Sequence, residues 1–536
     1  MRQGTTAGFF EKKRIIAKPG FNRWLVPPAA LAIHLCIGMA YGFSVFWLPM
    51  SQIVGQTCPA DSGFWHQLVT TDCDWRISML GWTYTLFFIF LGCSAALWGQ
   101  WLEKAGPRLV GMVATLCWSG GLALAALAIY SRQLWLLWLG AGAIGGTGLG
   151  LGYISPVSTL LRWFPDKRGM AAGMAIMGFG GGAMVGAPFA NMLMGVFADS
   201  GHAGIWQTLL VLAGIYFVFM LGGTLCYRIP PIGWHPLGWQ PKEEQAKGSS
   251  QMVHVSVACR TPQFWLLWLV LCLNVSAGIG ILGMASPMLQ EVFAGRLIGN
   301  DLSWGALNAG QLAQIAAIAA GFTGLLSLFN IGGRFFWASL SDYIGRKATF
   351  AIFFALGMVL YVSTVYAAGM GSVVLFVVLF CVIISMYGGG FATIPAYLAD
   401  MFGTQMVGAI HGRLLTAWSV AGILGPVLVN YLREYQLSIG TSPARTYEIT
   451  LYVLAGLLAV GFLCNLAVRR VPAKYAMSDE EIKQAASVYK RDPNMPLAWA
   501  PARSSYLPVA LAWLVGGSLM LWGIVVTVQQ AAHLFS

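Results

Sequence analysis

The chain is a succession of long apolar runs separated by short polar or turn-rich segments. A run of about 20 apolar residues is the length that a helix needs to cross the hydrocarbon core of a membrane. Polarity does not alternate along these runs, which favours helices over the strands of a barrel. The pattern predicts thirteen spans, at residues 24–50, 79–101, 109–130, 134–161, 171–197, 206–227, 264–289, 316–340, 351–370, 373–398, 410–432, 447–468 and 507–528.

Composition supports the same class. Only 9% of the 536 residues are charged and 57% are hydrophobic, whereas soluble domains carry about 25% charged residues. The mean hydropathy is +0.70. We therefore expect an all-α polytopic membrane protein that lies in a lipid bilayer.

The net charge of +12 follows the loops and predicts an orientation, not a nucleic-acid partner. With the amino terminus inside, the inner segments hold 25 of the 31 Lys and Arg residues. The outer segments hold five, Arg76, Arg132, Arg296, Arg433 and Arg445, and Arg334 lies within a span. By the positive-inside rule, we expect a multi-pass protein of a bacterial inner membrane, with a cytoplasmic amino terminus and a periplasmic carboxyl terminus.

Two span ends are alike and mark an internal repeat. The sequence GQWLEKAGPR (99–108) and the sequence SDYIGRK (341–347) each place a glycine three residues after an acid, followed by a cation. Glu103 and Asp342 are 239 residues apart, as are Gly106 and Gly345. Pro156 and Pro395 keep this offset, and Phe164 and Phe402 are 238 apart. The repeat predicts two six-helix halves, with a substrate site between them near the membrane midplane.

The repeat also predicts the domain boundaries. We expect a cytoplasmic segment (1–23), two six-helix halves (24–227 and 264–468), a cytoplasmic linker between them (228–263), a second linker (469–506) and an additional span (507–528). Ser478 and Glu481 have the spacing of a capping box, which predicts a short surface helix at 478–489. The additional span has no counterpart in either half. We expect it to pack outside the bundle and to contact a protein partner or lipid.

Three segments carry a resemblance to a known family. GLGLGYISPVSTLLRWFPDKRGMAAGMAIMGFGGG (148–182) strongly resembles the oxalate/formate antiporter-like family of the major facilitator superfamily. NRWLVPPAALAIH (22–34) and FGTQMVGAIHGRLLTAW (402–418) are similar to it too. The acid-Gly-basic loops after spans two and eight resemble the superfamily as a whole. The resemblance covers roughly residues 20–470 and implies a carrier of small organic anions.

Arg334 is the strongest candidate for binding such an anion. It lies in the eighth span with no acid within seven residues on either side. A cation at membrane depth costs roughly 2.5–3.5 kcal/mol on insertion scales and normally faces a cavity or a partner. Its planar guanidinium matches a carboxylate with two parallel hydrogen bonds. The alternative is a structural role against carbonyl groups near Gly332 and Gly333.

The resemblance adds further site residues and one departure. Members that handle oxalate carry a cation in span eight, as here, and also a lysine in span eleven. The matching position in this chain is Trp418. One cation predicts a monocarboxylate such as formate, acetate, lactate or pyruvate, with oxalate or another dicarboxylate as the alternative. Aromatic residues that match the family's site, or else only pack the spans, are Tyr41, Tyr153, Tyr387 and Phe391.

Other polar residues suggest coupling and gating. His34 lies within the first span, where it either carries a coupling proton or is a hydrogen-bonded core residue. Glu103, Arg108, Asp342 and Arg346 are expected to form charge pairs that hold an inner gate. His411 and Arg413 are the main threat to the single-cation prediction, because either side chain can turn inward from span eleven.

The remaining motifs exclude other chemistry. Of the ten cysteines, only Cys58 and Cys73 share a loop, and in an oxidising periplasm they are expected to form a disulfide. The sequence has no metal-ligand cluster, nucleotide-binding loop or catalytic triad, so we expect no enzyme activity, metal or cofactor. Anion exchange or proton coupling is expected to drive transport. The alternatives are an exporter of apolar or cationic compounds and a non-transporting sensor of the same fold.

Overall fold

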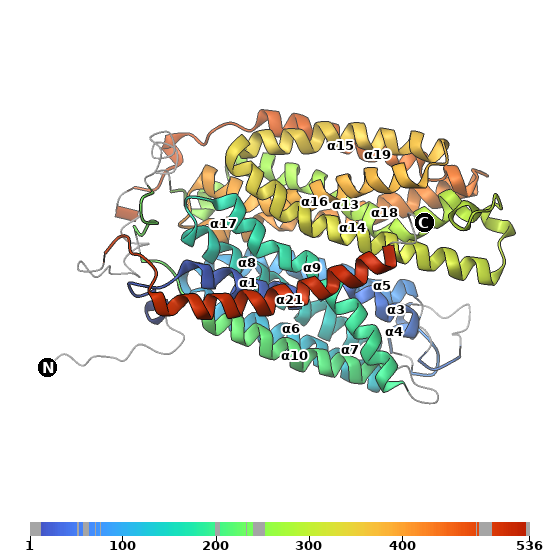
Figure 1. Ribbon diagram of the computed structural model, residues 1–536, viewed down its shortest axis with the longest axis horizontal. Helices are drawn as coiled ribbons and strands as arrows, with labels where there is room; N and C mark the ends of the chain where they lie inside the picture. Colours follow the sequence, from blue (N-terminus) through green and yellow to red (C-terminus); the bar gives the residue numbers. More distant parts are fainter. Residues whose placement is uncertain are drawn as a thin grey trace.

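The computed structural model describes residues 12–50, 53–56, 64–69, 71–75, 77–198, 204–231, 233–239, 252–478, 480–481 and 496–531. Two bundles of helices lie side by side, and one further helix, α21, runs obliquely across them (Figure 1). Each bundle comes from one half of the chain. We call the end of the bundles at which α5 ends and α17 begins the inner end.

The first half contains the predicted spans one to six. They correspond to α1 Val26–Ile37 with α2 Met39–Gly42, η3 Phe43–Phe46 and α3 Trp47–Met50, then α5 Ile77–Ala105, α6 Pro107–Tyr130, α7 Leu134–Leu137 with η4 Trp138–Gly145 and α8 Gly146–Trp163, α9 Arg168–Phe197 and α10 Ile205–Cys226. The first span breaks at Gly38. A Cβ there would lie 2.2 Å from the carbonyl oxygen of Phe179, so only glycine lets α1 approach α9 this closely.

The second half repeats this arrangement. Its helices are α13 Pro262–Phe293, α14 Ala309–Ile344, α15 Arg346–Gly369, α16 Val373–Phe402, α17 Val407–Leu414 with α18 Thr416–Ser438, and α19 Glu448–Ala467. The additional helix is α21, Tyr506–Ala531. Short elements in the loops include α4 Phe64–Val69 and α12 Val255–Ala258. The predicted fold class is confirmed: two six-helix halves and one extra helix near the carboxyl terminus.

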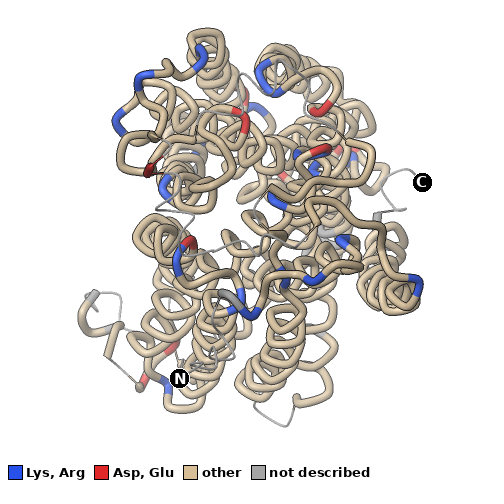
Figure 2. The backbone as a smooth tube through the Cα atoms, turned by 90° about the vertical axis from the view of Figure 1, so that its left-hand side faces the viewer, with Lys and Arg blue, Asp and Glu red and all other residues tan. Residues whose placement is uncertain are grey.

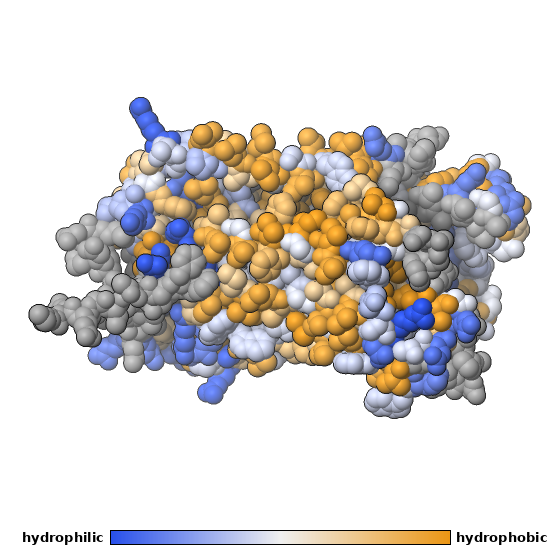
Figure 3. Space-filling view, turned by 90° about the horizontal axis from the view of Figure 1, so that it is seen from below, coloured by the Kyte–Doolittle hydropathy of each residue, from blue (hydrophilic) through white to orange (hydrophobic). Residues whose placement is uncertain are grey.

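An apolar band covers the middle of the molecule in the view of Figure 3. Among the described residues, twelve helices are long and apolar enough to cross a membrane. α14, with 36 residues, packs along them in the second bundle. Hydrophobic residues cover the middle of the surface, and hydrophilic residues gather toward the two ends (Figure 3). Together these thirteen helices match the thirteen predicted spans.

The repeat is visible at the inner ends of α5 and α14. Both helices stop at a glycine with positive φ, 90° at Gly106 and 89° at Gly345, a conformation that favours glycine. The cation two residues after each glycine then binds the carbonyl end of the last helix in its own half. Arg108 donates to the carbonyl oxygens of Leu225 and Tyr227, and Lys347 donates to those of Leu466 and Val468. Arg108 and Lys347 are 239 residues apart.

Two predictions fall partly outside the described residues. In the proposed surface helix, Ser478 and Glu481 exchange capping hydrogen bonds, while residues 482–489 lie outside the described part of the chain. In the outer loop, Cys73 is disulfide-bonded and Cys58 lies outside the described residues. The pairing of Cys58 with Cys73 therefore stays a prediction.

Candidate substrate-binding site

Arg334 lies near the middle of α14, on the surface that meets the first half. Its side chain is fully buried. Nε donates to Asn330 Oδ1 (2.9 Å) on the same helix, and Nη1 donates to the carbonyl oxygen of Ile176 (3.1 Å) on α9. Nη2 is buried and has no hydrogen-bond partner among the described residues. One donor face of the guanidinium thus stays available.

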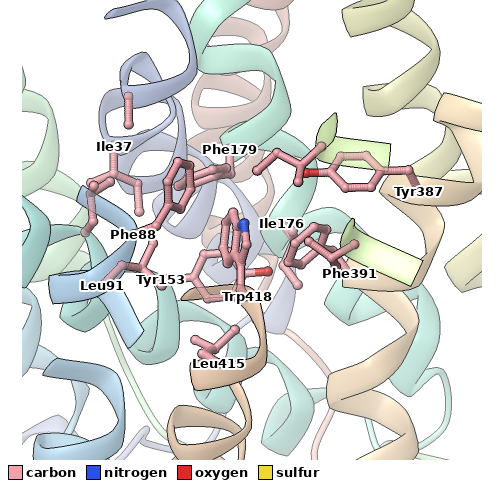
Figure 4. Close-up of a cluster of buried hydrophobic side chains, with 14 of the residues drawn as sticks. Ile37, Phe88, Leu91, Tyr153, Ile176, Phe179, Tyr387, Phe391, Leu415 and Trp418 are labelled. Carbon is pink, nitrogen blue, oxygen red and sulfur yellow. The ribbon is translucent and has the colours of Figure 1, made fainter. Parts of the chain in front are cut away.

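Aromatic rings from both halves surround this guanidinium. Its Cζ atom lies 5.8 Å from the ring centroid of Phe179 on α9 and 5.5 Å from that of Phe391 on α16. Trp418, at the start of α18, packs on Phe391 with ring centroids 4.3 Å apart and on Tyr153 at 5.4 Å. In Figure 4, Trp418 lies between Tyr153 and Phe391 in the middle of the cluster.

The two halves also meet at a pair of tyrosines. Tyr41 on α2 and Tyr387 on α16 approach with their hydroxyl oxygens 3.4 Å apart. Tyr41 also packs edge-on against Phe179, with ring centroids 4.9 Å apart. Tyr41, Tyr153, Tyr387, Phe391 and Trp418 therefore belong to one cluster around Arg334. The sequence pointed to these residues one by one, and the structure brings them together.

The centre of the cluster holds polar atoms that the protein does not satisfy. The buried atoms without a hydrogen-bond partner among the described residues include Arg334 Nη2, Tyr153 Oη, Trp418 Nε1, His34 Nε2 and His411 Nε2. An unsatisfied polar group costs about 1–3 kcal/mol when it is buried. The first three are N–H or O–H donors, and an anion is the ligand that such donors favour.

The rings of His34 and His411 both pack against Tyr153. Their ring centroids are 5.4 Å and 5.8 Å from that of Tyr153. His34 Nδ1 contacts the carbonyl oxygen of Ala175. Because a carbonyl only accepts, Nδ1 carries the proton, which leaves Nε2 of the neutral ring as a proton acceptor. His411 turns inward from α17, whereas Arg413 points away, toward the carbonyl oxygen of Val255 and the sulfur of Cys259.

At the inner end, Glu103 joins the two halves. Its Oε1 accepts a hydrogen bond from the backbone N–H of Gly408 (3.1 Å), at the start of α17. Its Oε2 pairs with Arg162 on α8. The carboxylate thus lies at the amino-terminal end of a helix in the opposite half, where the helix dipole favours negative charge.

Asp342 makes the corresponding contact in the other direction. Its two carboxylate oxygens accept from the backbone N–H groups of Gly169 (2.8 Å) and Met170 (2.9 Å), at the start of α9. Arg346 pairs with Asp342 (2.5 Å) and with Asp400 (3.1 Å) on α16. Asp400 in turn pairs with Arg168 on α9 (2.7 Å). We call these contacts, with those of Glu103 and Arg162, the inner gate.

Comparison with known sequences identifies the family. The profile of the Major Facilitator Superfamily matches residues 30–426 and, in a second match, 322–534. This chain belongs to the major facilitator superfamily. It is a membrane transporter of that superfamily and not an enzyme.

Similar superfamily members have been assigned several cargoes. The chain is 27% identical over 405 residues to the oxalate:formate antiporter of Oxalobacter formigenes, which covers 75% of this chain and 83% of the relative. It is 24% identical over 449 residues to apicoplast pyruvate carrier 1 of Toxoplasma gondii, covering 74% and 77%. It is 22% identical over 407 residues to the uncharacterized transporter YhjX of Escherichia coli, covering 75% and 86%.

Solved structures of the superfamily show the same fold. The chain aligns with a crystal structure of FucP in the outward conformation at a TM-score of 0.57 and 13% identity, covering 84% of this chain and 100% of the other. The proton:xylose symporter XylE aligns at a TM-score of 0.58 and 12% identity, covering 84% and 97%. At these identities the likeness concerns the fold alone.

Several residues of the candidate site escaped sequence reasoning. Phe179 stacks on the guanidinium from inside a glycine-rich stretch, and Phe88 on α5 packs on Trp418 with ring centroids 5.5 Å apart. Neither ring differs in sequence from the many other aromatic residues of the spans. Asn330 gave a usable signal, because it is a polar residue four positions before Arg334 in an apolar run.

Proposed function

We propose that this protein is a secondary active transporter of small monocarboxylates. Arg334 binds the carboxylate through its available Nη2 face, and the aromatic rings of Tyr41, Tyr153, Phe391 and Trp418 enclose the remainder. The observation that carries the proposal is a fully buried guanidinium with one unsatisfied nitrogen, placed between the two halves. The relatives named for formate and pyruvate support the substrate class.

The preference for one carboxylate follows from charge. Among the described residues around the cluster, Arg334 is the one permanently charged side chain, and an unpaired buried carboxylate carries a heavy penalty. Trp418 lies at the position that matches the span-eleven lysine of oxalate-handling members of the resembled family. We expect a monocarboxylate to bind at least about tenfold more tightly than oxalate, which corresponds to roughly 1.4 kcal/mol.

The oxalate antiporter relative and the inward position of His411 favour a second candidate, a dicarboxylate carrier. A protonated His411 would supply the missing cation. Competition against a labelled monocarboxylate separates the two candidates. If oxalate competes as well as any monocarboxylate, the single-cation proposal is wrong, and His411→Gln should then abolish the oxalate competition selectively.

His34 offers a site for a coupling proton. Phe179 lies against both the His34 ring and the Arg334 guanidinium, so a positive charge on one opposes a positive charge on the other. A carboxylate on Arg334 cancels that repulsion, so an anion and a proton on Nε2 stabilise each other. We therefore expect His34→Gln to retain anion exchange and to lose proton-driven accumulation. A variant that still accumulates anion in response to a pH gradient would exclude this role.

The direct test of the proposal is substitution of Arg334. Arg334→Ala should abolish counterflow of labelled formate, lactate or pyruvate in proteoliposomes. Arg334→Lys should lose most of it, because an ammonium lacks the two parallel donors. Thermal unfolding of both variants checks that the fold is retained. Undiminished counterflow in a folded Arg334→Ala variant contradicts the proposal, and absence of counterflow in the wild type would favour the sensor alternative.

The proposed orientation places the inner end in the cytoplasm. Figure 2 views the molecule from this end, with Lys and Arg in blue, and the predicted inner segments hold 25 of the 31 Lys and Arg residues. Such an excess of cations is typical of the cytoplasmic side of a membrane protein.

A further inference from the structure

One face of α21 carries a regular stripe of contacts with the bundles. The contacting residues are Trp513, Gly516, Met520, Gly523 and Thr527, at intervals of three and four. This spacing places them on one side of a helix. The rest of α21 is largely exposed: only 11% of its most apolar window is buried, compared with 78% for the first span.

The stripe crosses from one half to the other. Near its inner end, Trp513 Nε1 donates to the carbonyl oxygen of Trp24 (3.2 Å), and Gly516 faces Leu31 on α1. In the middle, Met520 lies against Gly181, and Gly523 lies against Met184 and Val185, all on α9. At the outer end, Thr527 packs on Gly324 of α14. Figure 1 shows this oblique path over the junction of the two bundles.

The inner end of α21 is tied to the first half by the segment that precedes it. Trp499 Nε1 donates to the carbonyl oxygen of Phe21 (3.1 Å), and its ring lies 5.7 Å from that of Trp234. The backbone N–H of Ala502 donates to the carbonyl oxygen of Gly20 (2.8 Å). α21 is therefore fixed to the first half at one end and contacts the second half at the other.

α21 lies against α9 and α14 on the outer side of the region where these two helices contact each other closely. Toward the inner end, Gly169, Gly173 and Gly180 of α9 lie directly against Ala338, Arg334 and Ile331 of α14, respectively. From this level outward α21 lies against both helices: it contacts Gly181 and Val185 of α9 and Gly324 of α14. In alternating access the two halves rock about the central site, so outer closure requires α9 and α14 to approach at this level.

We infer that α21 is a conformational strap: it holds the conformation that is closed at the inner gate, and its outer end must leave α14 before the outer side can close. The packing of glycines against side chains allows this close but apolar contact to form and separate without breaking charge pairs. The inference rests on alternating access in the superfamily and does not depend on which anion is carried.

The contact between α21 and α14 allows a direct test. A Cβ at position 324 would lie 3.9 Å from the Cβ of Thr527, within the range of about 3.5–4.5 Å that a disulfide requires. Gly324→Cys with Thr527→Cys should therefore cross-link the outer end of α21 to the second half. The control, Leu31→Cys with Gly516→Cys, is placed to cross-link α21 to the first half, where Leu31 Cγ lies 3.9 Å from a Cβ at position 516. Mass spectrometry confirms that each bond has formed.

The readout is inner opening, which needs no substrate. Ala338 is fully buried at the junction of α9 and α14, so a cysteine there reacts with a maleimide only when the inner end opens. All native cysteines except Cys58 and Cys73 are replaced. The engineered pair is oxidised first, and the protein then reacts with the maleimide. The 324–527 bond should slow labelling at least about fivefold relative to an uncross-linked parent without the engineered pair. The control bond should leave the labelling rate within twofold of that parent.

Each other outcome overturns the strap. Equal labelling with the 324–527 bond formed means that α21 moves with the second half. Slowing by both bonds means that α21 must also leave the first half, and failure of the 324–527 bond to form means that the contact is not as described. Truncation before Tyr506 gives a second measurement: a folded truncated protein should label faster at position 338, because the inner-closed conformation has lost its support.

Discussion

The two acids of the inner gate make equivalent contacts in opposite directions. Glu103 of the first half accepts from the backbone N–H of Gly408, and Asp342 of the second half accepts from that of Gly169. Both the acids and the glycines are 239 residues apart. Each half therefore places a carboxylate on the start of a helix in the other half, and the two contacts are related by the repeat.

The charges around these acids differ. Glu103 pairs with Arg162 on α8. On α16 the repeat continues with the 238-residue offset of Phe164 and Phe402. The position equivalent to Arg162 is therefore Asp400, which has the opposite charge. Asp342 is instead held by Arg346, which Asp400 also binds, and Asp400 reaches Arg168 across the halves. The contact of Glu103 includes the ion pair with Arg162, whereas the contact of Asp342 belongs to a network of four charges.

The difference indicates where the gate is sensitive. The side chains of Glu103 and Arg162 are 7% and 20% exposed, so removing one charge leaves the other nearly buried. In the network, Asp400 is 40% exposed, and Arg346 has two acids. Loss of one member there leaves other pairs in place. The repeat therefore duplicated the helix contact, and we expect the Glu103 contact to be more sensitive than the Asp342 contact to the loss of one charge.

The largest effect is expected at Glu103. Glu103→Gln leaves Arg162 without its counter-ion and should destabilise the inner-closed conformation by about 2 kcal/mol, below the 3–5 kcal/mol of a fully buried pair because Arg162 is partly exposed. A cysteine at Ser158, which is 5% exposed beside Gly408, should then label roughly 30-fold faster. The matched variant, Asp342→Asn, should change labelling at position 338 by less than about tenfold. Equal effects of the Glu103 and Asp342 substitutions would remove the distinction between the two contacts.

Exchange of the charges should sharpen the comparison. Glu103→Arg with Arg162→Glu restores an ion pair but places a cation at the N–H of Gly408, where the helix dipole favours an anion. We expect the double variant to label at a rate between those of the wild type and Glu103→Gln. Full recovery would mean that the pair alone closes this gate. Absence of recovery would mean that the contact with Gly408 dominates.

The repeat and the spans could be read from the sequence because each depends on local pattern. Apolar length predicts a span, and the glycines with positive φ at residues 106 and 345 predict where it ends. The partners across the halves could not be read in the same way. We expected Arg108 to take part in the gate, and the structure shows that it donates to the carbonyl oxygens at the carboxyl end of α10. Its counterpart is Lys347, which only the packing of α10 and α19 reveals.

The candidate site shows the same limit. The sequence indicated Arg334, because an isolated cation in an apolar run is costly. The direction in which the His411 side chain points depends on the break between α17 and α18, where Leu415 separates the two helices. Such a break sets which side of span eleven points inward. Sequence pattern left both His411 and Arg413 as candidates, and the structure turns only His411 toward Tyr153.

The smallest effect is expected at Asp400. Asp400→Asn removes its pairs with Arg346 and Arg168, but Arg346 keeps Asp342, and the two backbone hydrogen bonds to Asp342 remain. Partly exposed pairs contribute about 0.5 kcal/mol each, so loss of both should raise labelling at position 338 by no more than about fivefold. Salt screens such pairs over roughly 8–10 Å. The wild type should therefore approach the labelling rate of the variant as ionic strength rises, while Glu103→Gln should stay well above both. If Asp400→Asn opens the gate as far as Glu103→Gln does, the network depends on this exposed acid and is not redundant.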